Sequence, residues 1–136
     1  MTKSRSARER IIEEVTSWPG VRAAPGDLGE LAFQLGRREI GHLHGDRTAH
    51  FGFPKKIWAE LRKQGRIAPH PVFPDQQGPA ARRIEGEADV RDVIAMLRLN
   101  YDRIVARHGL PEEASLAERH RRANASRRRA SLATRS

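Results

Sequence analysis

A long run of apolar residues at helical spacing constrains the fold more than any other feature of this sequence. Between Glu87 and Arg107 the apolar side chains recur every three or four residues and so fall on one face of a helix: Val90, Val93, Ile94, Leu97, Tyr101, Ile104 and Val105. A helix with such a continuous apolar face is stable only when another layer covers that face. The preceding residues must therefore supply that layer.

Residues 31–53 have the pattern of strands that could form it. Leu31, Phe33 and Leu35 alternate with Ala32 and Gln34, which is the period of a half-buried strand. The following run EIGHLHGDRTAHFGF predicts two more strands, joined at the Gly-Asp pair of residues 45–46. Three consecutive antiparallel strands are expected from this segment.

Helices and shorter strands complete the prediction. Ser6 and Glu9 form a capping box that begins a helix over residues 6–17, and Pro54 begins a short helix that Gly65 ends. Short strands are expected near Ile67 and over residues 81–84. The predicted fold class is α+β: a single antiparallel sheet of four or five strands between residues 21 and 84, flanked by N-terminal, middle and C-terminal helices.

Composition indicates a small soluble protein with a basic end. The 136 residues include no cysteine, which excludes disulfides and thiolate metal sites and favours a reducing, cytoplasmic location. No apolar run reaches the length of a membrane span, so no membrane partner is expected. Of the formal charge of +9, only +2 belongs to residues 1–118, because residues 119–136 hold seven arginines and no acid. We expect a folded domain over residues 1–110 and a disordered basic tail over residues 111–136.

That tail is a candidate for non-specific contact with polyanions, since clustered arginines bind nucleic acid or anionic surfaces through counterion release. The candidate polyanion-binding residues are Arg121, Arg122, Arg127, Arg128 and Arg129. A merely solubilising tail is the simpler interpretation.

The histidines form the one unusual cluster in the sequence. Four of the six lie between residues 42 and 70: His42, His44, His50 and His70. Residues i and i+2 of a strand share a face, so His42 and His44 must project together, as they do in several sheet-based metal sites. Three interpretations stay open: histidines that hydrogen-bond at the edge of the core, a metal site with His42 and His44 as weak candidate ligands, and acid–base catalysis.

The register of the hairpin decides whether His50 joins the pair. A two-residue loop at Gly45 and Asp46, which the turn chemistry favours, pairs His44 with Arg47 and leaves His50 on the opposite face. A three-residue loop or a bulge reverses the parity and brings His50 onto the face of His42 and His44, where His70 could join them.

These residues resemble the luciferase-like domain family, which includes the fungal luciferases and many uncharacterised bacterial and fungal proteins. The matching positions are Glu39, His42, His44, His50, Gly65, His70 and Pro71, and the resemblance covers roughly residues 20–105. The chain departs from the family in having Arg66 where an aromatic residue is common, and in being much shorter than the fungal luciferases.

The resemblance implies oxygenase chemistry, since fungal luciferases oxidise a hydroxylated pyrone with molecular oxygen and use neither flavin nor nicotinamide. It implies catalytic roles for His42, His44, His50 and His70, and contact of a small aromatic ligand with Glu39 and Phe51. No cofactor is expected, and the sequence has no phosphate-binding loop, dinucleotide fingerprint, GxSxG or HExxH motif. Imidazoles could supply the base that forms an electron-rich enolate and then stabilise a peroxide anion.

An alternative from a different class is a nucleic-acid-associated binding module. The expected architecture also resembles small DNA-associated proteins of frataxin-like fold, with Leu99, Asn100 and Tyr101 on the closing helix. Such a module would use the arginine-rich tail. Tyr101, Trp18 and Trp58 are expected to be packing residues, and the sequence leaves the oligomeric state open.

Overall fold

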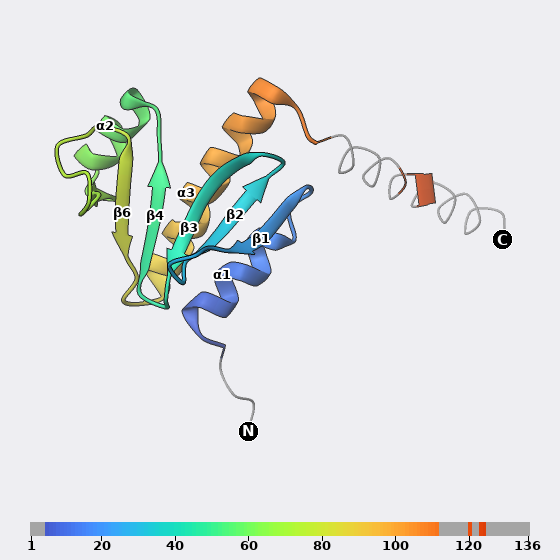
Figure 1. Cartoon of the computed structure of the whole chain (residues 1–136), viewed down its shortest axis with the longest axis horizontal. Helices are drawn as coiled ribbons and strands as arrows, with labels where there is room; N and C mark the ends of the chain where they lie inside the picture. Colours follow the sequence, from blue (N-terminus) through green and yellow to red (C-terminus); the bar gives the residue numbers. More distant parts are fainter. Residues whose placement is uncertain (1–4, 112–119, 121–122, 125–136) are drawn as a thin grey trace, which may run out of the picture.

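The structure, a computed structural model, describes residues 5–111, 120 and 123–124. The elements follow one another as α1 (Ala7–Thr16), β1 (Val21–Pro25), β2 (Leu31–Leu35), β3 (Arg38–His44), β4 (Thr48–Gly52), α2 (Lys55–Lys63), β5 (Ala68–Pro69), β6 (Pro79–Arg83) and α3 (Glu87–His108). Figure 1 shows their arrangement. The predicted helices are therefore confirmed within one or two residues at each end.

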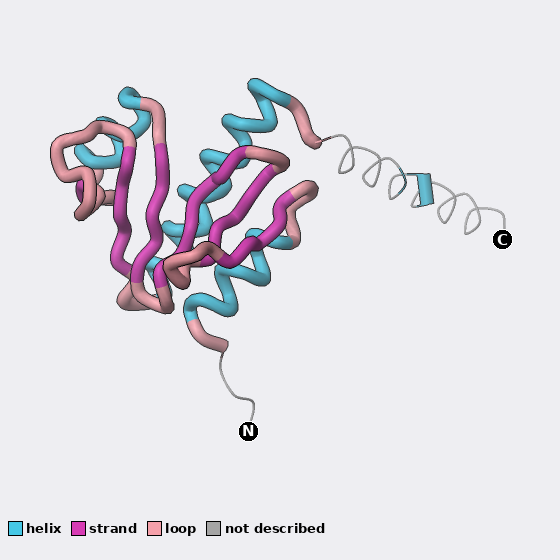
Figure 2. The backbone as a smooth tube through the Cα atoms, in the orientation of Figure 1, coloured by secondary structure: helices cyan, strands magenta, loops and turns pink. Residues whose placement is uncertain are grey.

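The strands form one antiparallel sheet in the order β1-β2-β3-β4-β6-β5 (Figure 2). This confirms the predicted α+β class, although the sheet has six strands and not four or five. The strand that the sequence did not predict is β1, which reads VRAAP and does not alternate, whereas β5, expected near Ile67, is the dipeptide Ala68–Pro69. Each gains its conformation from hydrogen bonds to a neighbouring strand, which local sequence patterns do not record.

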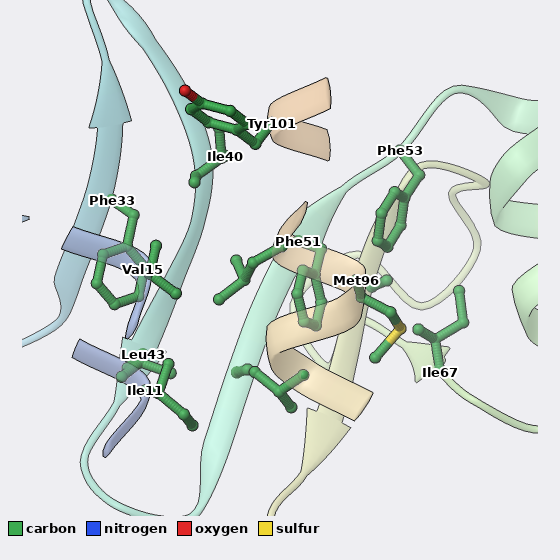
Figure 3. Packing of buried hydrophobic residues seen from close by; sticks show 14 of the residues in the cluster. Ile11, Val15, Phe33, Ile40, Leu43, Phe51, Phe53, Ile67, Met96 and Tyr101 are labelled. Carbon is green, nitrogen blue, oxygen red and sulfur yellow. The ribbon is translucent and has the colours of Figure 1, made fainter. Parts of the chain in front are cut away.

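Helices α1 and α3 cover one face of the sheet (Figure 1). Their apolar side chains meet the core-facing residues of the strands, as Figure 3 shows for Ile11 and Val15 near Phe33 and Leu43, and for Met96 near Phe51. All six of these residues are buried. The predicted apolar face of α3 is therefore covered by the predicted strands, with α1 beside it.

The expected packing roles of the aromatic residues are confirmed. Trp18, Trp58 and Tyr101 are buried, and the Tyr101 hydroxyl donates a hydrogen bond to the Pro19 carbonyl at 2.7 Å. The indole N–H of Trp58, on α2, donates to the Pro79 carbonyl at 3.0 Å and so fixes α2 beside β6. Apolar rings are buried in each case while their polar atoms keep a partner.

The loop between β3 and β4 has three residues, Gly45 to Arg47, so the favoured two-residue loop is wrong. His44 pairs with Thr48 and His42 pairs with His50. A two-residue type I′ turn needs positive φ at both of its central residues, but among the described residues only glycines have positive φ; here Gly45 has a φ of 62°. The extra residue, Arg47, instead accepts a hydrogen bond from the Ile84 amide beyond the end of β6.

Beyond this hairpin β3 and β4 part, and α3 passes behind this part of the sheet (Figure 1). Their ladder ends at the His42–His50 pair. The buried side-chain amide of Asn100 donates to the Ile40 carbonyl at 3.1 Å and to the Gly52 carbonyl at 3.0 Å. One residue of α3 thus satisfies two carbonyls that the diverging strands leave without a strand partner.

An ionic network ties the start of α3 to β6. Arg82 donates to Asp89 at 2.5 Å and to Asp92 at 2.7 Å, and Asp89 also accepts from the backbone N–H groups of Glu85 and Gly86. The hydrogen bond from Arg82, followed by those backbone bonds, holds the pKa of Asp89 below its usual range.

This network predicts acid sensitivity. Because the folded state lowers the pKa of Asp89, the unfolded chain binds more protons at low pH, so this contribution is present above the unfolded pKa of about 4 and is lost as the pH falls through the folded value. In urea titrations we expect Asp89→Asn to lower stability at pH 7 and to flatten its decline below pH 4. Asp102 is exposed, so Asp102→Asn is the control and should change neither the stability at pH 7 nor its decline below pH 4. If the stability of Asp89→Asn declined below pH 4 as steeply as that of the original protein, the expectation would be contradicted.

Candidate functional site

The face of the sheet opposite α1 and α3 carries the histidines. Side chains at paired positions of neighbouring strands share a face. Following the registers across the sheet from His42 and His50 therefore gives one row on this face, with one residue from each strand: Ala24, Ala32, His42, His50, Ala81 and Ala68. The two central imidazoles thus stand between the methyl groups of alanines.

Four imidazoles converge at this row. The ring centroid of His50 lies 5.1 Å from that of His42, 4.4 Å from that of His44 and 4.2 Å from that of His70, and the rings of His42 and His44 are 4.9 Å apart. His50 is buried at 7% exposure, and the other three are half-buried. The alternative register, which brings these side chains together, is the one that the chain adopts.

Hydrogen bonds orient two of the rings. His42 Nδ1 lies 3.0 Å from a carboxylate oxygen of Glu39, which can only accept, so Nδ1 carries the proton and Nε2 presents a lone pair. His42 Nε2 in turn lies 3.3 Å from His50 Nδ1. Glu39, His42 and His50 therefore form a connected chain in which the carboxylate fixes the tautomer of the first imidazole.

His70 is held differently, by the loop that follows β5. The backbone N–H of Val72 donates to His70 Nδ1 at 3.1 Å, so neutral His70 carries its proton on Nε2. The ring of Phe73 lies 5.3 Å from that of His70 and is 45% exposed. An apolar ring at the surface thus lies beside the histidine cluster.

Burial and the neighbouring imidazoles disfavour protonation of His50 and His70. Burial first, and then the imidazoles of His70, His44 and His42, lower the pKa of His50 to about 4. Burial, and then the imidazoles of His42 and His44, also lower the pKa of His70. At neutral pH His50 is therefore uncharged, and one of its ring nitrogens offers a lone pair.

The structure separates Phe51 from the other predicted site residues. Phe51 is 4% exposed, and its ring is stacked on that of Phe53 at 5.3 Å, within the core covered by α3. Glu39, by contrast, lies at the cluster, as described above. The predicted polyanion-binding arginines, residues 121, 122 and 127–129, lie outside the described residues.

Sequence analysis overlooked two features of this site. Phe73 lies in a segment rich in prolines, where no periodicity relates it to the strands. The row of alanines depends on the register of all six strands. The alanines that form this row lie far apart in the sequence, and they can be recognised as neighbours only when the pairing of the strands is known.

The chemistry available to this arrangement depends on nitrogen lone pairs. His42, His44 and His50 each offer a ring nitrogen, and these nitrogens all lie within 4.8 Å of one another. Such a set can accept protons, donate hydrogen bonds from its N–H groups or bind a metal ion. Neighbouring methyl groups and an exposed phenyl ring suit a flat, partly apolar ligand.

Comparison with known proteins relates this region to a family model. Residues 37–100 match the model described as Luciferase domain, and this range contains β3 to β6, α2, the four clustered histidines and the first two-thirds of α3. No curated protein matches the chain. No solved structure matches it. Among the described residues, no helix combines the length and the apolar character needed to cross a membrane.

Proposed function

Residues 37–100 match a luciferase domain, and from that premise we propose that this chain is a small-molecule oxygenase that binds an enolisable, hydroxylated aromatic compound on its histidine face. The observation that carries the proposal is the convergence of His42, His44, His50 and His70 at one row of the sheet, whose other members are alanines. Neither flavin nor nicotinamide is part of the proposed reaction.

The surroundings of the cluster support this class of ligand. A flat ring can lie over the methyl group of the half-buried Ala81, which flanks His50 in the row. The exposed ring of Phe73 can contact the edge of that ligand, and aromatic pairs at such distances are mutually attractive. A hydroxyl on the ligand would then face the imidazoles.

The proposed reaction adds molecular oxygen to an enolate. The hydroxyl proton goes to His50 Nε2 while the proton on His50 Nδ1 passes to His42 Nε2, and the resulting imidazolium of His42 is held by Glu39. The enolate then donates electron density to oxygen as a carbon–oxygen bond forms. The product is a peroxide anion, which recovers the proton from the imidazolium and becomes a hydroperoxide. The sum is ligand plus oxygen to hydroperoxide, with the carbon oxidised by two electrons and the oxygen molecule reduced by two.

His70 has a separate role in this scheme. Because its Nδ1 accepts from the Val72 N–H, its Nε2–H is a donor, and a fixed donor can stabilise the developing peroxide anion. The neutral state of this imidazole leaves that proton in place. His70 would thus act on the second step, and His50 with His42 on the first.

Oxygen uptake tests the proposal. Purified protein would be screened with hydroxylated pyrones and related enolisable aromatics in an oxygen electrode, with binding followed separately under anaerobic conditions through the NMR signals of the histidine rings. We expect uptake with at least one compound, and shifts of the signals of His42, His44, His50 and His70.

Variants make this test specific. His70→Phe should lower the rate of oxygen uptake by roughly 100-fold, the usual cost of removing one donor to an oxyanion, while leaving anaerobic binding in place. His108→Phe is the matched control, since this histidine is exposed and contacts Arg38 at the far end of α3. Binding that shifts only the signals of His108 or His120 would contradict the proposed site.

A further inference from the structure

We propose that His42, His44 and His50 together bind one divalent first-row transition-metal ion, with an open coordination position toward the exposed side of the sheet. The inference rests on the proposed function only in that the ion and the proposed ligand would bind on the same face of the sheet. Its geometric basis is independent, because three ring nitrogens from two neighbouring strands already lie within 4.8 Å of one another.

The spacing of the best-defined pair fits a shared ion. Tetrahedral coordination with metal–nitrogen bonds of about 2.0–2.1 Å places two ligand nitrogens about 3.3 Å apart. His42 Nε2 and His50 Nδ1 are separated by 3.3 Å. Small rotations of the rings about their side-chain bonds would bring the third nitrogen, from His44, to the same ion.

The hydrogen bonding of this pair also favours an ion. In the structure the two nitrogens share one proton: His42 Nε2 accepts, because its Nδ1 donates to Glu39, and His50 Nδ1 donates. When an ion replaces that proton, both nitrogens present lone pairs to it, and His50 carries its own proton on Nε2 instead. No backbone movement is needed for this exchange.

Glu39 is the outer partner that such a site requires. Histidines that bind metals almost always donate their other ring N–H to a carboxylate, a backbone carbonyl or water, which fixes the ring and raises its basicity. Glu39 accepts from His42 Nδ1 at 3.0 Å in this way. The carboxylate and the first ligand are three residues apart on β3, where the bulge between β2 and β3 lies.

His70 is not a ligand in this proposal, although its ring is close to that of His50. Binding an ion through Nε2 would require the proton to move to Nδ1, which instead accepts from the Val72 N–H at 3.1 Å. If Nδ1 carried the proton, two N–H donors would point at each other, and the hydrogen bond from Val72 would be lost. His70 therefore provides a matched control within the same cluster.

The donor set selects the class of ion. Three imidazoles without thiolate or carboxylate ligands suit zinc, copper, nickel, cobalt or iron, whereas magnesium and calcium prefer oxygen ligands. Three protein ligands with an open position are typical of catalytic sites and not of structural ones. An ion there would bind the hydroxyl oxygen of the proposed ligand and lower its pKa, so its charge would replace His50 and His42 as the means of forming the enolate.

Titration of the full chain without an affinity tag tests the inference. Protein stripped with a chelator would be titrated with Co²⁺, followed by visible absorption, and with Zn²⁺, followed by calorimetry. We expect one ion per chain, the intense absorption of tetrahedral Co²⁺, and its loss when Zn²⁺ is added. Folded protein that binds neither ion would overturn the proposal.

Substitutions identify the ligands. His42→Ala, His44→Ala and His50→Ala should each weaken binding by about 100-fold or more, and Glu39→Gln by about 10- to 100-fold, as for other outer partners. The ion affinities of His70→Ala and His108→Ala should stay within about 3-fold of that of the original protein, a much smaller change than the loss of an outer partner causes.

Folding of the variants is a separate control. Because His50 is buried, circular dichroism would confirm folding, and the half-buried His44→Gln keeps the test decisive if His50→Ala does not fold. Loss of binding in His70→Ala, with retention in His44→Ala, would overturn the assignment.

Oxygen uptake separates this inference from the proposed function. Ion binding at these histidines without oxygen uptake for any compound would refute the oxygenase and leave the metal site intact. Equal oxygen uptake by stripped protein, together with an absence of ion binding, would refute the metal site and leave the imidazole-based oxygenase intact.

Discussion

Asn100→Leu should lower the free energy of unfolding by about 2–4 kcal/mol, one of the largest effects of a single substitution in this chain. Leucine has a similar volume but cannot donate, so the buried Ile40 carbonyl and the Gly52 carbonyl would both lose the Asn100 amide. A buried carbonyl left without a donor costs about 1–3 kcal/mol, and the second lost hydrogen bond adds to that loss. Urea titration at pH 7 would measure the change, with an expected decrease in melting temperature of roughly 10 °C or more.

Arg103→Ala is the matched control for this variant. Arg103 donates to the Asn100 side-chain oxygen at 3.2–3.3 Å from a half-buried position, so its removal leaves the amide and its two carbonyl partners in place. We expect Arg103→Ala to lower the free energy of unfolding by less than about 1 kcal/mol. Equal losses in the two variants would show that the strand carbonyls are not the source of the effect.

Gly41→Val should be comparably destabilising and should also disturb the histidine cluster. A Cβ atom at Gly41 would lie 2.5 Å from Leu97 Cδ2 and 3.1 Å from the His50 carbonyl oxygen. Leu97 is 1% exposed, so its side chain has little space into which to move, and overpacking of this kind costs about 1–3 kcal/mol or more. Because His42 is the next residue, a shift of β3 at this point would also change the distance between His42 and His50.

Two measurements would check this expectation. Urea titration gives the loss of stability, and NMR of the ring signals of His42 and His50 reports whether the cluster moves. The control is Gly52→Ala, in the neighbouring strand, where an added Cβ would meet nothing within 4 Å. A Gly41 variant as stable as the Gly52 variant would mean that α3 and β3 can separate at no cost.

Both expectations concern contacts between α3 and the two strands that carry the histidines. Asn100 and Leu97 lie on the buried side of the sheet, whereas the imidazoles project from the other side. The spacing of the cluster therefore depends on a helix that lies on the opposite face of the sheet. A substitution on α3 can change the site without altering any of its side chains.

The sequence by itself determined the elements with strong local patterns. The apolar stripe of α3, the alternation in β2 and the Ser6 cap of α1 each depend on residues within a few positions of one another, and each is confirmed. The cap bond from the Glu9 N–H to the Ser6 hydroxyl, at 3.1 Å, is an interaction that spacing alone predicts. The pairing of His42 and His44 on one face follows equally from the period of a strand.

Only the tertiary structure decided how these pieces meet. The loop of residues 45–47 was one residue longer than its turn chemistry indicated, and that single residue determines on which face His50 lies. β1 is a strand because β2 pairs with it, and Phe51 is a core residue because α3 covers its face. Register, edge pairing and the choice of buried face depend on contacts between residues distant in sequence, which no local pattern contains.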